Sequence, residues 1–487
     1  MAKQWKFVAS LATSLISGSA LATNGFNLDG YGPISESMGG ASMAFDNGGA
    51  GMINNPATLA LMPRDSARFE FGLGDLMPKV EANGQKSNVK NIYIPGVAYT
   101  RKDGDIAWGA GVLMQGGIGT EYSNGNYLGN TAGFGAGNDT SGLNKVNKAE
   151  LGVGRVVFPL AYSVNENLSI GGSIDYVWAG MDLQWMVDGA HFADMISPGL
   201  VGPTSQSIGR INGSLVDTLV AGVQGGQITG LSWGYLNFNK DGQFSRAAKG
   251  HGWAGNLGFT YKLTSDFTIG AVYHAKTNLS DLSTGGNSAQ FTVNATIGGA
   301  NTPVPMSGKI TVKNFQWPET YGFGMSYQAS DSWQFAADYK RINWSGVMRD
   351  LNMVFEASGN QANPVAASLV GGGKTLNINY SQNWSDQNIL QLGAAYKYSN
   401  DLVLRFGASF SNNPIPNSTV SPLFPVILKE HYTAGFGYSF DKHHSIESAF
   451  MYAPKVTVTN NWSSVAGSNQ TISVGGSSYQ VTYNYRF

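Results

Sequence analysis

The sequence feature that most constrains the fold is a long alternation between large apolar residues and small or polar ones. It is clearest in residues 168–178, 253–263 and 402–410. A period of two is typical of β-strands whose two faces meet different surroundings. One face of these segments is formed by Leu168, Ile170, Ile174, Tyr176, Trp178, Trp253, Leu257, Phe259, Tyr261, Leu263, Leu402, Leu404, Phe406, Ala408 and Phe410. The pattern predicts long strands, each with one apolar face.

The charge content indicates what the apolar face meets. Charged residues make up 13% of the chain, against about 25% in an average soluble domain. A soluble β-sandwich buries its apolar face and needs charges on the other face, which here is mostly Gly, Ser, Thr and Asn. After residue 22, no apolar run reaches the roughly 18 residues of a spanning helix. A closed β-barrel is the other structure that satisfies every backbone polar group in lipid. The sequence therefore predicts an all-β membrane protein, and its net charge of -1 gives no reason to expect nucleic acid as a partner.

The N-terminus has the features of an export signal. Lys3 and Lys6 precede a short apolar stretch at 7–16, and Ala20-Leu21-Ala22 is a small-x-small cleavage sequence. We predict a signal peptide over 1–22. Cysteine is absent, which excludes disulfides and thiolate metal sites and is compatible with export. Export together with lipid-facing strands predicts a multi-pass barrel in the outer membrane of a Gram-negative bacterium.

Short polar turns give an expected number of strands. Six such turns recur, each just after a tyrosine; these are Tyr99, Tyr162, Tyr261, Tyr327, Tyr396 and Tyr438. In a barrel with both termini on one side, six short turns imply fourteen strands and seven connections on the far side. The longest far-side loops are predicted at 120–147, 185–248 and 280–308, and the others near 83–88, 357–374, 411–428 and 459–474. We therefore predict a fourteen-stranded antiparallel transmembrane β-barrel over residues 67–487.

Two terminal segments differ from the strands between them. Residues 23–66 are rich in Gly, Asn, Ala and Met and show no sustained alternation, which favours a compact N-terminal hatch that plugs the barrel. A periplasmic tail is the alternative for this segment. The C-terminus alternates and ends on Phe487, and it resembles the signal read by the outer-membrane assembly machinery.

Several motifs stand at a recognisable spacing. Near the N-terminus these are Asn24-Gly25-Phe26, Ser37-Met38-Gly39-Gly40-Ala41 and Asn55-Pro56-Ala57. Further along are Gly117-Ile118-Gly119-Thr120-Glu121-Tyr122, Trp317-Pro318-Glu319-Thr320 and Asn343-Trp344-Ser345. Together they resemble the FadL/TodX-type outer-membrane transporters of long-chain fatty acids and other hydrophobic compounds. The resemblance extends over the whole mature chain.

The resemblance implies a function and a path. Extracellular loops would capture the ligand and pass it to an interior pocket beside the hatch. The hatch would include Asn55, Pro56 and Ala57, with Thr23 as the mature terminus near the pocket. A general diffusion porin for polar solutes is the alternative function. The resemblance implies no cofactor, and the expected partners are a hydrophobic small molecule, outer-membrane lipid and lipopolysaccharide; we expect a monomer.

In the same family the ligand leaves sideways through an opening at a kinked third strand. Gly116, Gly117 and Gly119 lie where that kink is expected. Glycine inside a strand also marks bulges and bends on general grounds. The alternative is that these glycines relieve crowding in a curved wall.

The loop at 185–248 contains a second apolar pattern. Residues Ile208, Ile211, Leu215, Leu219 and Val223 recur at spacings of three or four, which predicts a helix with one apolar face. We expect this face and the 280–308 loop to form an external ligand groove, with packing alone as the alternative. Elsewhere, Lys276 and Arg405 are expected to face the lumen, where they would meet a carboxylate substrate or join a network of lumenal charges.

Enzyme chemistry is not expected. Residues 230–234 match the G-x-S-x-G nucleophile pattern around Ser232, but that motif requires a strand before it and a helix after it. The match lies in a predicted loop of a chain rich in Gly and Ser. The six histidines show no spacing typical of metal ligands, so no metal site is predicted.

Overall fold

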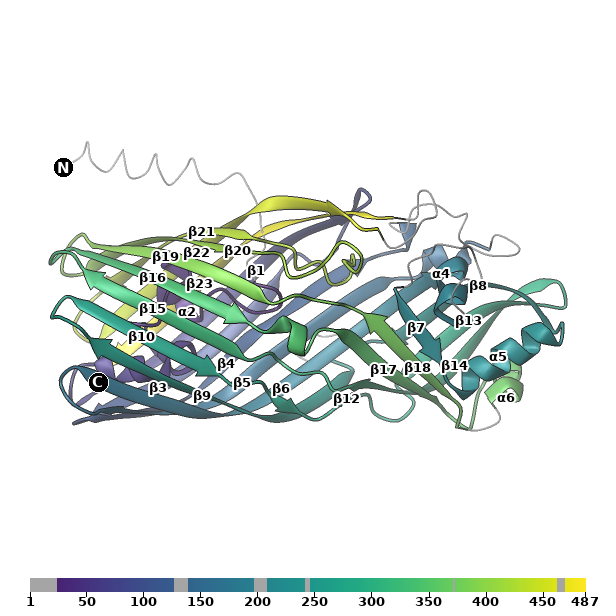
Figure 1. The fold of residues 1–487 in the computed structure, drawn as a ribbon, viewed down its shortest axis with the longest axis horizontal. Coiled ribbons are helices and arrows are strands. Elements are labelled where there is room, and N and C mark those ends of the chain that lie inside the picture. Colours follow the sequence, from purple (N-terminus) through teal and green to yellow (C-terminus); the bar gives the residue numbers. More distant parts are fainter. Residues whose placement is uncertain (1–23, 127–138, 197–207, 241–245, 371–372, 462–468) are drawn as a thin grey trace.

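The computed structural model describes residues 24–126, 139–196, 208–240, 246–370, 373–461 and 469–487. These residues form one sheet of 23 strands that closes on itself into an elongated barrel (Figure 1). Closure comes from antiparallel pairing of the first strand, β1 (Ser66–Ala82), with the last, β23 (Thr471–Arg486). In the described part of the chain, no helix is long and apolar enough to cross a membrane.

The closed wall is a circuit of 18 hydrogen-bonded strands. From β1 it runs through β3 (Ile92–Asp103), β4 (Ile106–Tyr122), β5 (Asn147–Ser163), β6 (Leu168–Asp188), β8 (Ile228–Phe238), β13 (Ala289–Ile297), β14 (Ala300–Lys313), β12 (Leu282–Ser283), β9 (Ala248–Lys262), β10 (Phe267–His274), β15 (Thr320–Gln328), β16 (Trp333–Ile342), β19 (Gln387–Lys397), β20 (Leu402–Ser411), β21 (Glu430–Ser439) and β22 (His444–Thr459) to β23. The remaining strands of the sheet are β2 (Gln85–Lys86), β7 (Gly209–Asn212), β11 (Asn278–Leu279), β17 (Asp350–Ala357) and β18 (Thr375–Ser381).

The predicted count of fourteen strands is wrong. All six short turns do join hydrogen-bonded neighbours, but counting turns finds only the strands that reach that end of the wall. β6 pairs with β9 over Leu168–Met181 and then with β8 over Leu183–Asp188. Above this change of partner, β8, β13, β14 and β12 are inserted between β6 and β9. These strands lie in the stretches 185–248 and 280–308, which were predicted to be loops.

The outer face of the wall is apolar, as the alternation predicts. Ile174, Leu257 and Phe406 expose 65%, 68% and 53% of their surface. Exposed aromatic residues near the six turns include Trp108, Tyr162, Tyr261, Tyr327, Trp333, Tyr438 and Phe440. Such a band suits hydrocarbon with an aromatic girdle at its boundary. We call this end, which also carries the C-terminus, the turn end.

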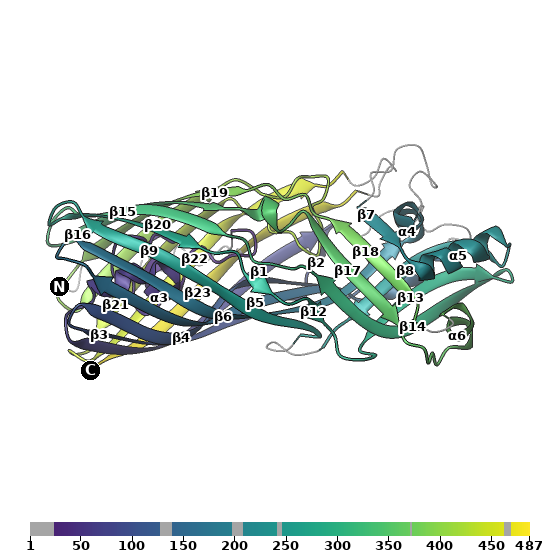
Figure 2. The ribbon, with the colours of Figure 1, turned by 60° about the horizontal axis from the view of Figure 1, so that its bottom comes forward.

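Most of the helices lie at the two ends of the barrel (Figures 1 and 2). The N-terminal part of the described chain forms α2 (Gly32–Ser37), α3 (Gly51–Asn54) and η1 (Pro56–Leu61) inside the wall near the turn end. At the opposite, loop end are η4 (Ser141–Asn144), α4 (Gly189–Ile196), α5 (Ser214–Gln224) and α6 (Pro364–Val370). A short turn, η5 (Trp344–Gly346), lies between β16 and β17. The largest buried apolar cluster joins strands of the loop-end half.

Candidate functional site

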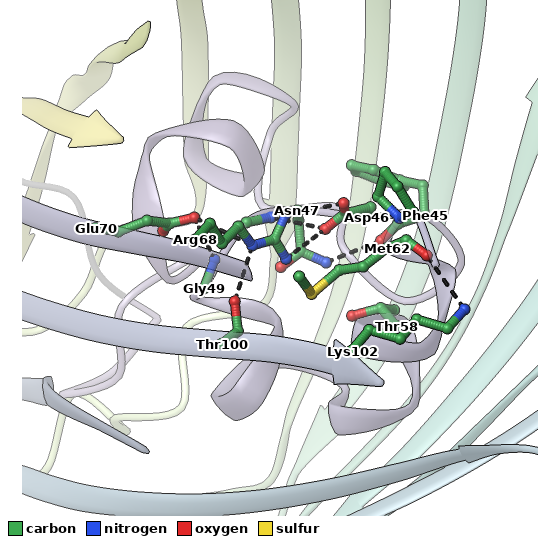
Figure 3. Close-up of polar contacts among 12 residues, drawn as sticks. Phe45, Asp46, Asn47, Gly49, Thr58, Met62, Arg68, Glu70, Thr100 and Lys102 are labelled. Carbon is green, nitrogen blue, oxygen red and sulfur yellow. Dashed lines mark hydrogen bonds and ion pairs between the residues drawn. The ribbon is translucent and has the colours of Figure 1, made fainter. Parts of the chain in front are cut away.

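The N-terminal stretch 24–62, here called the interior segment, is bound to the wall by polar contacts (Figure 3). The Arg68 guanidinium of β1 donates to both carboxylate oxygens of Asp46, at 2.9 and 2.8 Å. Glu70 of the same strand accepts from the Gly49 N–H at 2.8 Å, and the ammonium of Lys102 on β3 donates to the Met62 carbonyl at 3.1 Å. β1 and β3 therefore hold the segment at one side of the lumen.

Strands further round the wall, β16 and β21, provide further anchors. Asp338 of β16 accepts from the N–H groups of Ser42 and Met43, at 2.7 and 3.1 Å. His431 of β21 lies 2.9 Å from the Asp29 carboxylate, and both side chains are almost completely buried. Buried charges of this kind are expensive unless they are paired, so these contacts favour one position of the segment.

The predicted hatch residues Asn55, Pro56 and Ala57 lie in the interior segment. The Asn55 side chain donates to the Met43 carbonyl at 2.8 Å and accepts from the Ala57 N–H at 3.2 Å, where it caps η1. A side chain at Gly258 of β9 would come within 2.1 Å of the Asn55 amide oxygen. Glycine in the wall therefore allows the segment to approach this closely. Thr23 lies outside the described residues.

β3 and β4 separate above the turn end and leave a gap in the wall. They pair only from Val97 with Val112 down to Asp103 with Ile106. Above that point, the rest of β3 (92–96) pairs with β1, and within the described chain it has no partner in β4. The segment just before β3 meets β4 again near the loop end, where the Asn88 N–H donates to the Glu121 carbonyl at 2.7 Å.

At the gap, β4 bends towards the interior segment. A bulge lies between Met114 and Gly116, the Gly117 N–H donates to the Phe26 carbonyl at 2.9 Å, and Gly116 forms a β-bridge with Asn27. The predicted kink residues Gly116 and Gly117 thus lie where backbone hydrogen bonds pass from the wall to the segment. Gly119 lies further along β4, beside the Ile92 side chain.

Replacing Gly116 with Val tests this contact. A Cβ atom at this position would lie 2.0 Å from the Phe26 carbonyl oxygen, so the backbone must shift. We expect Gly116→Val to lower the free energy of unfolding by about 1–3 kcal/mol, the usual cost of overpacking, and to expose the segment to protease. Gly346→Val is the control because no atom lies within 4 Å of its Cβ position. Equal stability and equal digestion of the two variants would contradict the assignment.

A cavity of about 70 Å³, here called the lateral cavity, lies at the gap. Leu28, Tyr31 and Ala50 of the interior segment line it on one side, and Ile94 and Leu113 of β3 and β4 line it on the other. Glu70, Glu447 and Asn484 add a polar edge. An apolar path therefore leads from the interior segment to the gap in the wall.

Above the lateral cavity lies a cluster of rings, here called the aromatic chamber. The Phe26 ring lies 4.8 Å from Trp384, 5.9 Å from Trp344 and 6.2 Å from Phe424, measured between centroids. Trp317 lies 6.5 Å from Phe26 and donates its indole N–H to Asn27 at 3.2 Å. The space that remains beside Phe26 and Phe424 is only about 10 Å³, and it is also lined by Leu151, Met181, Phe315, Met348, Leu351 and Gln382. A ligand enters only if flexible side chains such as the methionines move.

Sequence reasoning did not find this chamber. The motifs around Trp317 and Trp344 were interpreted only as part of the family resemblance, and the structure places Trp317 between β14 and β15 and Trp344 in η5. Phe26 was noticed only as part of an N-terminal motif. One signal was available in the sequence. Trp317 and Trp344 lie outside the alternating strands, so they are not expected to face lipid and could have been predicted to lie inside the barrel.

The predicted external groove is largely covered. Leu215 and Leu219 of α5 are buried in the main apolar cluster, while Val223 is 45% exposed. Ile208 and Ile211 are also buried, but they lie before and within β7, so the helix is shorter than predicted. In this conformation only Val223 of the five is open to a ligand.

A small outer cavity of about 10 Å³ lies close to Ile208 at the loop end. It is lined by Trp185, Asp188, His191, Leu423 and others. Burial disfavours a charged His191, but the adjacent Asp188 carboxylate, 2.6 Å away, outweighs this effect and raises the pKa of His191. Leu423 lines this cavity, and the next residue, Phe424, belongs to the aromatic chamber.

The two predicted lumenal cations have different surroundings. Arg405 is buried and donates to the protein's own Glu447 at 2.6 Å. Lys276 is exposed beside an open cleft that Lys313 and Arg349 also line. Ser232 lies inside β8 and its hydroxyl is buried, so the strand-turn-helix of a nucleophile elbow is not formed there.

A lipid-facing barrel that holds an N-terminal segment and has a gap in its wall defines an outer-membrane transport protein. The chain belongs to the family described as outer membrane protein transport protein (OMPP1/FadL/TodX), which it matches over residues 9–487. The predicted family and the predicted outer-membrane location are thereby confirmed.

Solved structures and curated relatives agree with this membership. The toluene transporter TodX of P. putida has 29% sequence identity and a TM-score of 0.75, covering 94% of this chain and 99% of its own. The toluene transporter TbuX of Ralstonia pickettii has 30% identity and a TM-score of 0.71, covering 95% and 99%. The long-chain fatty acid transport protein of Escherichia coli (strain K12) is 22% identical over 475 residues, 92% of this chain and 91% of the relative.

Proposed function

We propose that the protein takes up apolar small molecules passively and releases them sideways into the outer membrane. The ligand enters at the loop end, passes the outer cavity and the aromatic chamber, and leaves through the lateral cavity between β3 and β4. The observation that carries the proposal is the gap itself, which is lined by apolar side chains and opens beside the interior segment.

The physical reason for such a path is the polar layer outside the membrane. An apolar molecule gains roughly 0.8 kcal/mol per CH₂ on leaving water, so entry into lipid is downhill once the saccharides are passed. No energy source is needed. The interior segment acts as a hatch that keeps polar solutes from leaking through a barrel of this size.

Small aromatic hydrocarbons fit the proposal better than polar solutes. The chamber is lined by rings and methionines, with no charged residue among its lining side chains. TodX and TbuX, which share 29% and 30% of their residues with this chain, are toluene transporters. Long-chain fatty acids are the second candidate class, supported by the more distant E. coli relative.

The partners follow from the surface. The apolar belt meets lipid and the polar loop end meets lipopolysaccharide, and the protein acts as a monomer. The terminal Phe487 is exposed and its N–H donates to the Ala67 carbonyl at 3.0 Å, which leaves its ring available to the assembly machinery. The protein performs no catalysis in this proposal.

Uptake by whole cells tests the function. A Gram-negative host that lacks its own transporter of this kind should take up labelled toluene or oleate faster when it expresses the chain. Entry of a labelled disaccharide should not change, because the interior segment blocks the lumen. Faster disaccharide entry without faster toluene or oleate entry would favour a diffusion porin instead.

A further inference from the structure

A row of alternate buried side chains changes from apolar to partly polar as it approaches the aromatic chamber. Residues 376, 378, 380, 382 and 384 are all buried, while Ser385 and Asn383 beside them are exposed. The row begins with Leu376 and Ile378 of β18 and continues with Tyr380, Gln382 and Trp384. Its last three members therefore bring polar atoms into apolar surroundings.

These polar atoms are poorly satisfied. The Trp384 indole N–H has no hydrogen-bond partner in the described chain, although the residue is only 3% exposed. The Tyr380 hydroxyl and the Gln382 side-chain amide lie close to each other, but neither the hydroxyl nor the amide nitrogen makes a hydrogen bond of normal geometry in the described chain. An unsatisfied buried polar group is costly, and most buried polar groups in native proteins are paired.

One unpaired donor lines the space where a ligand would lie, and the other belongs to a ring that packs beside that space. Gln382 lines the aromatic chamber, and the Trp384 ring contacts Phe26 and Trp344 at 4.8 and 5.2 Å. By contrast, the other two indoles of the chamber are satisfied: Trp317 donates to Asn27 and Trp344 donates to Gln387. The unmet hydrogen-bonding capacity is thus concentrated at Gln382 and Trp384.

The chemistry of these groups limits the ligand. An indole nitrogen only donates, so the ligand must bring an acceptor. Burying an ionised carboxylate without a countercharge is very expensive, and no charged side chain lines the chamber. A neutral oxygen on an otherwise apolar molecule meets both conditions.

We infer that Gln382 and Trp384 bind a neutral oxygen acceptor, so that the chamber selects ketones, esters or ethers with an apolar body over hydrocarbons of the same shape. This inference rests on the proposed function and names its substrate class. An unsubstituted hydrocarbon leaves both donors unpaired, whereas a carbonyl oxygen accepts from one or both.

The test compares two ligands of similar shape, acetophenone and isopropylbenzene, on the purified protein in detergent. Dissociation constants are measured by calorimetry and corrected for each ligand's partition between water and hydrocarbon. We expect Gln382→Leu and Trp384→Phe each to weaken acetophenone binding about fivefold, the effect of losing one hydrogen bond. Isopropylbenzene has no hydrogen-bond acceptor. Its dissociation constant should therefore change by the same factor in Trp384→Phe and in Trp317→Phe.

Trp317→Phe is the matched control, because it removes a ring of the same size whose N–H already has a partner. It should leave the ratio of the two affinities unchanged. Ratios that are the same in the wild type and in both donor variants would overturn the inference while leaving the proposed function intact. If the wild type binds neither ligand, the proposed function itself fails for small aromatic molecules.

Discussion

Deletion of residues 24–62 should turn a closed protein into a conducting pore. The wall is a circuit of 18 strands, and barrels of about 16–18 strands leave an aqueous channel unless something fills them. In this protein the interior segment lies in that space, and it contacts β1 through Asp46 and β21 through Asp29. In a planar bilayer we expect discrete current steps from the deletion variant and only background current from the intact protein.

Correct folding must be established separately, because the deletion leaves Arg68 and His431 without their partners. A folded barrel migrates faster than its heated form in a denaturing gel, and this shift should persist in the deletion variant. Asp46→Asn, which weakens one anchor but keeps the segment, should remain closed. A deletion variant that shows the gel shift but gives no current would mean that something other than the interior segment closes the lumen.

Filling the lateral cavity from Gly96 should slow release of substrate. A Cβ atom at Gly96 would have only the Leu113 side chain and the Val112 carbonyl nearby, at 3.3 and 3.8 Å, so a phenyl ring added there extends into the cavity. We expect the ring to raise the barrier to passage by about 1–3 kcal/mol, the usual cost of overpacking, which slows passage by roughly five- to 150-fold. The measurement is the initial rate of labelled toluene or oleate uptake by cells expressing Gly96→Phe.

Two controls separate blockage from misfolding. Gly285→Phe adds the same ring at a loop-end position with no atom within 4 Å, and it should leave uptake unchanged. Gly96→Phe should still bind acetophenone or isopropylbenzene in detergent, since the aromatic chamber is formed by other residues. Normal uptake by a folded Gly96→Phe protein would show that substrate does not leave between β3 and β4.

The resemblance noticed in the sequence extended the prediction beyond the wall. It indicated Gly116 and Gly117 as a kink, and the structure places them at the bulge where β4 contacts the interior segment. It did not indicate what the kink does to hydrogen bonding. Partners such as Phe26 and Gly117 are distant in sequence, and no local pattern specifies their pairing.

In the predicted loop at 185–248, the local pattern was correct but its surroundings could not be predicted. The spacing of Leu215 and Leu219 correctly indicated an apolar helix face, but spacing carries no information about what covers that face. In the structure, the face belongs to the main apolar cluster. Ile208 and Ile211 matched the same spacing, yet β-pairing of Ile211 with Ile378 of β18 places it in a strand.

Local sequence patterns were enough to predict the lipid-facing strands, the six short turns and the membrane class, because these depend on neighbours within a few residues. Tertiary structure alone decided the 18-strand circuit, since β6 changes partner midway and the inserted strands contact residues distant in sequence. It also decided the aromatic chamber, whose rings come from five separate parts of the chain: Phe26, Trp317, Trp344, Trp384 and Phe424. Local periodicity reports which face of a strand is apolar, but only the closed wall brings such distant side chains together.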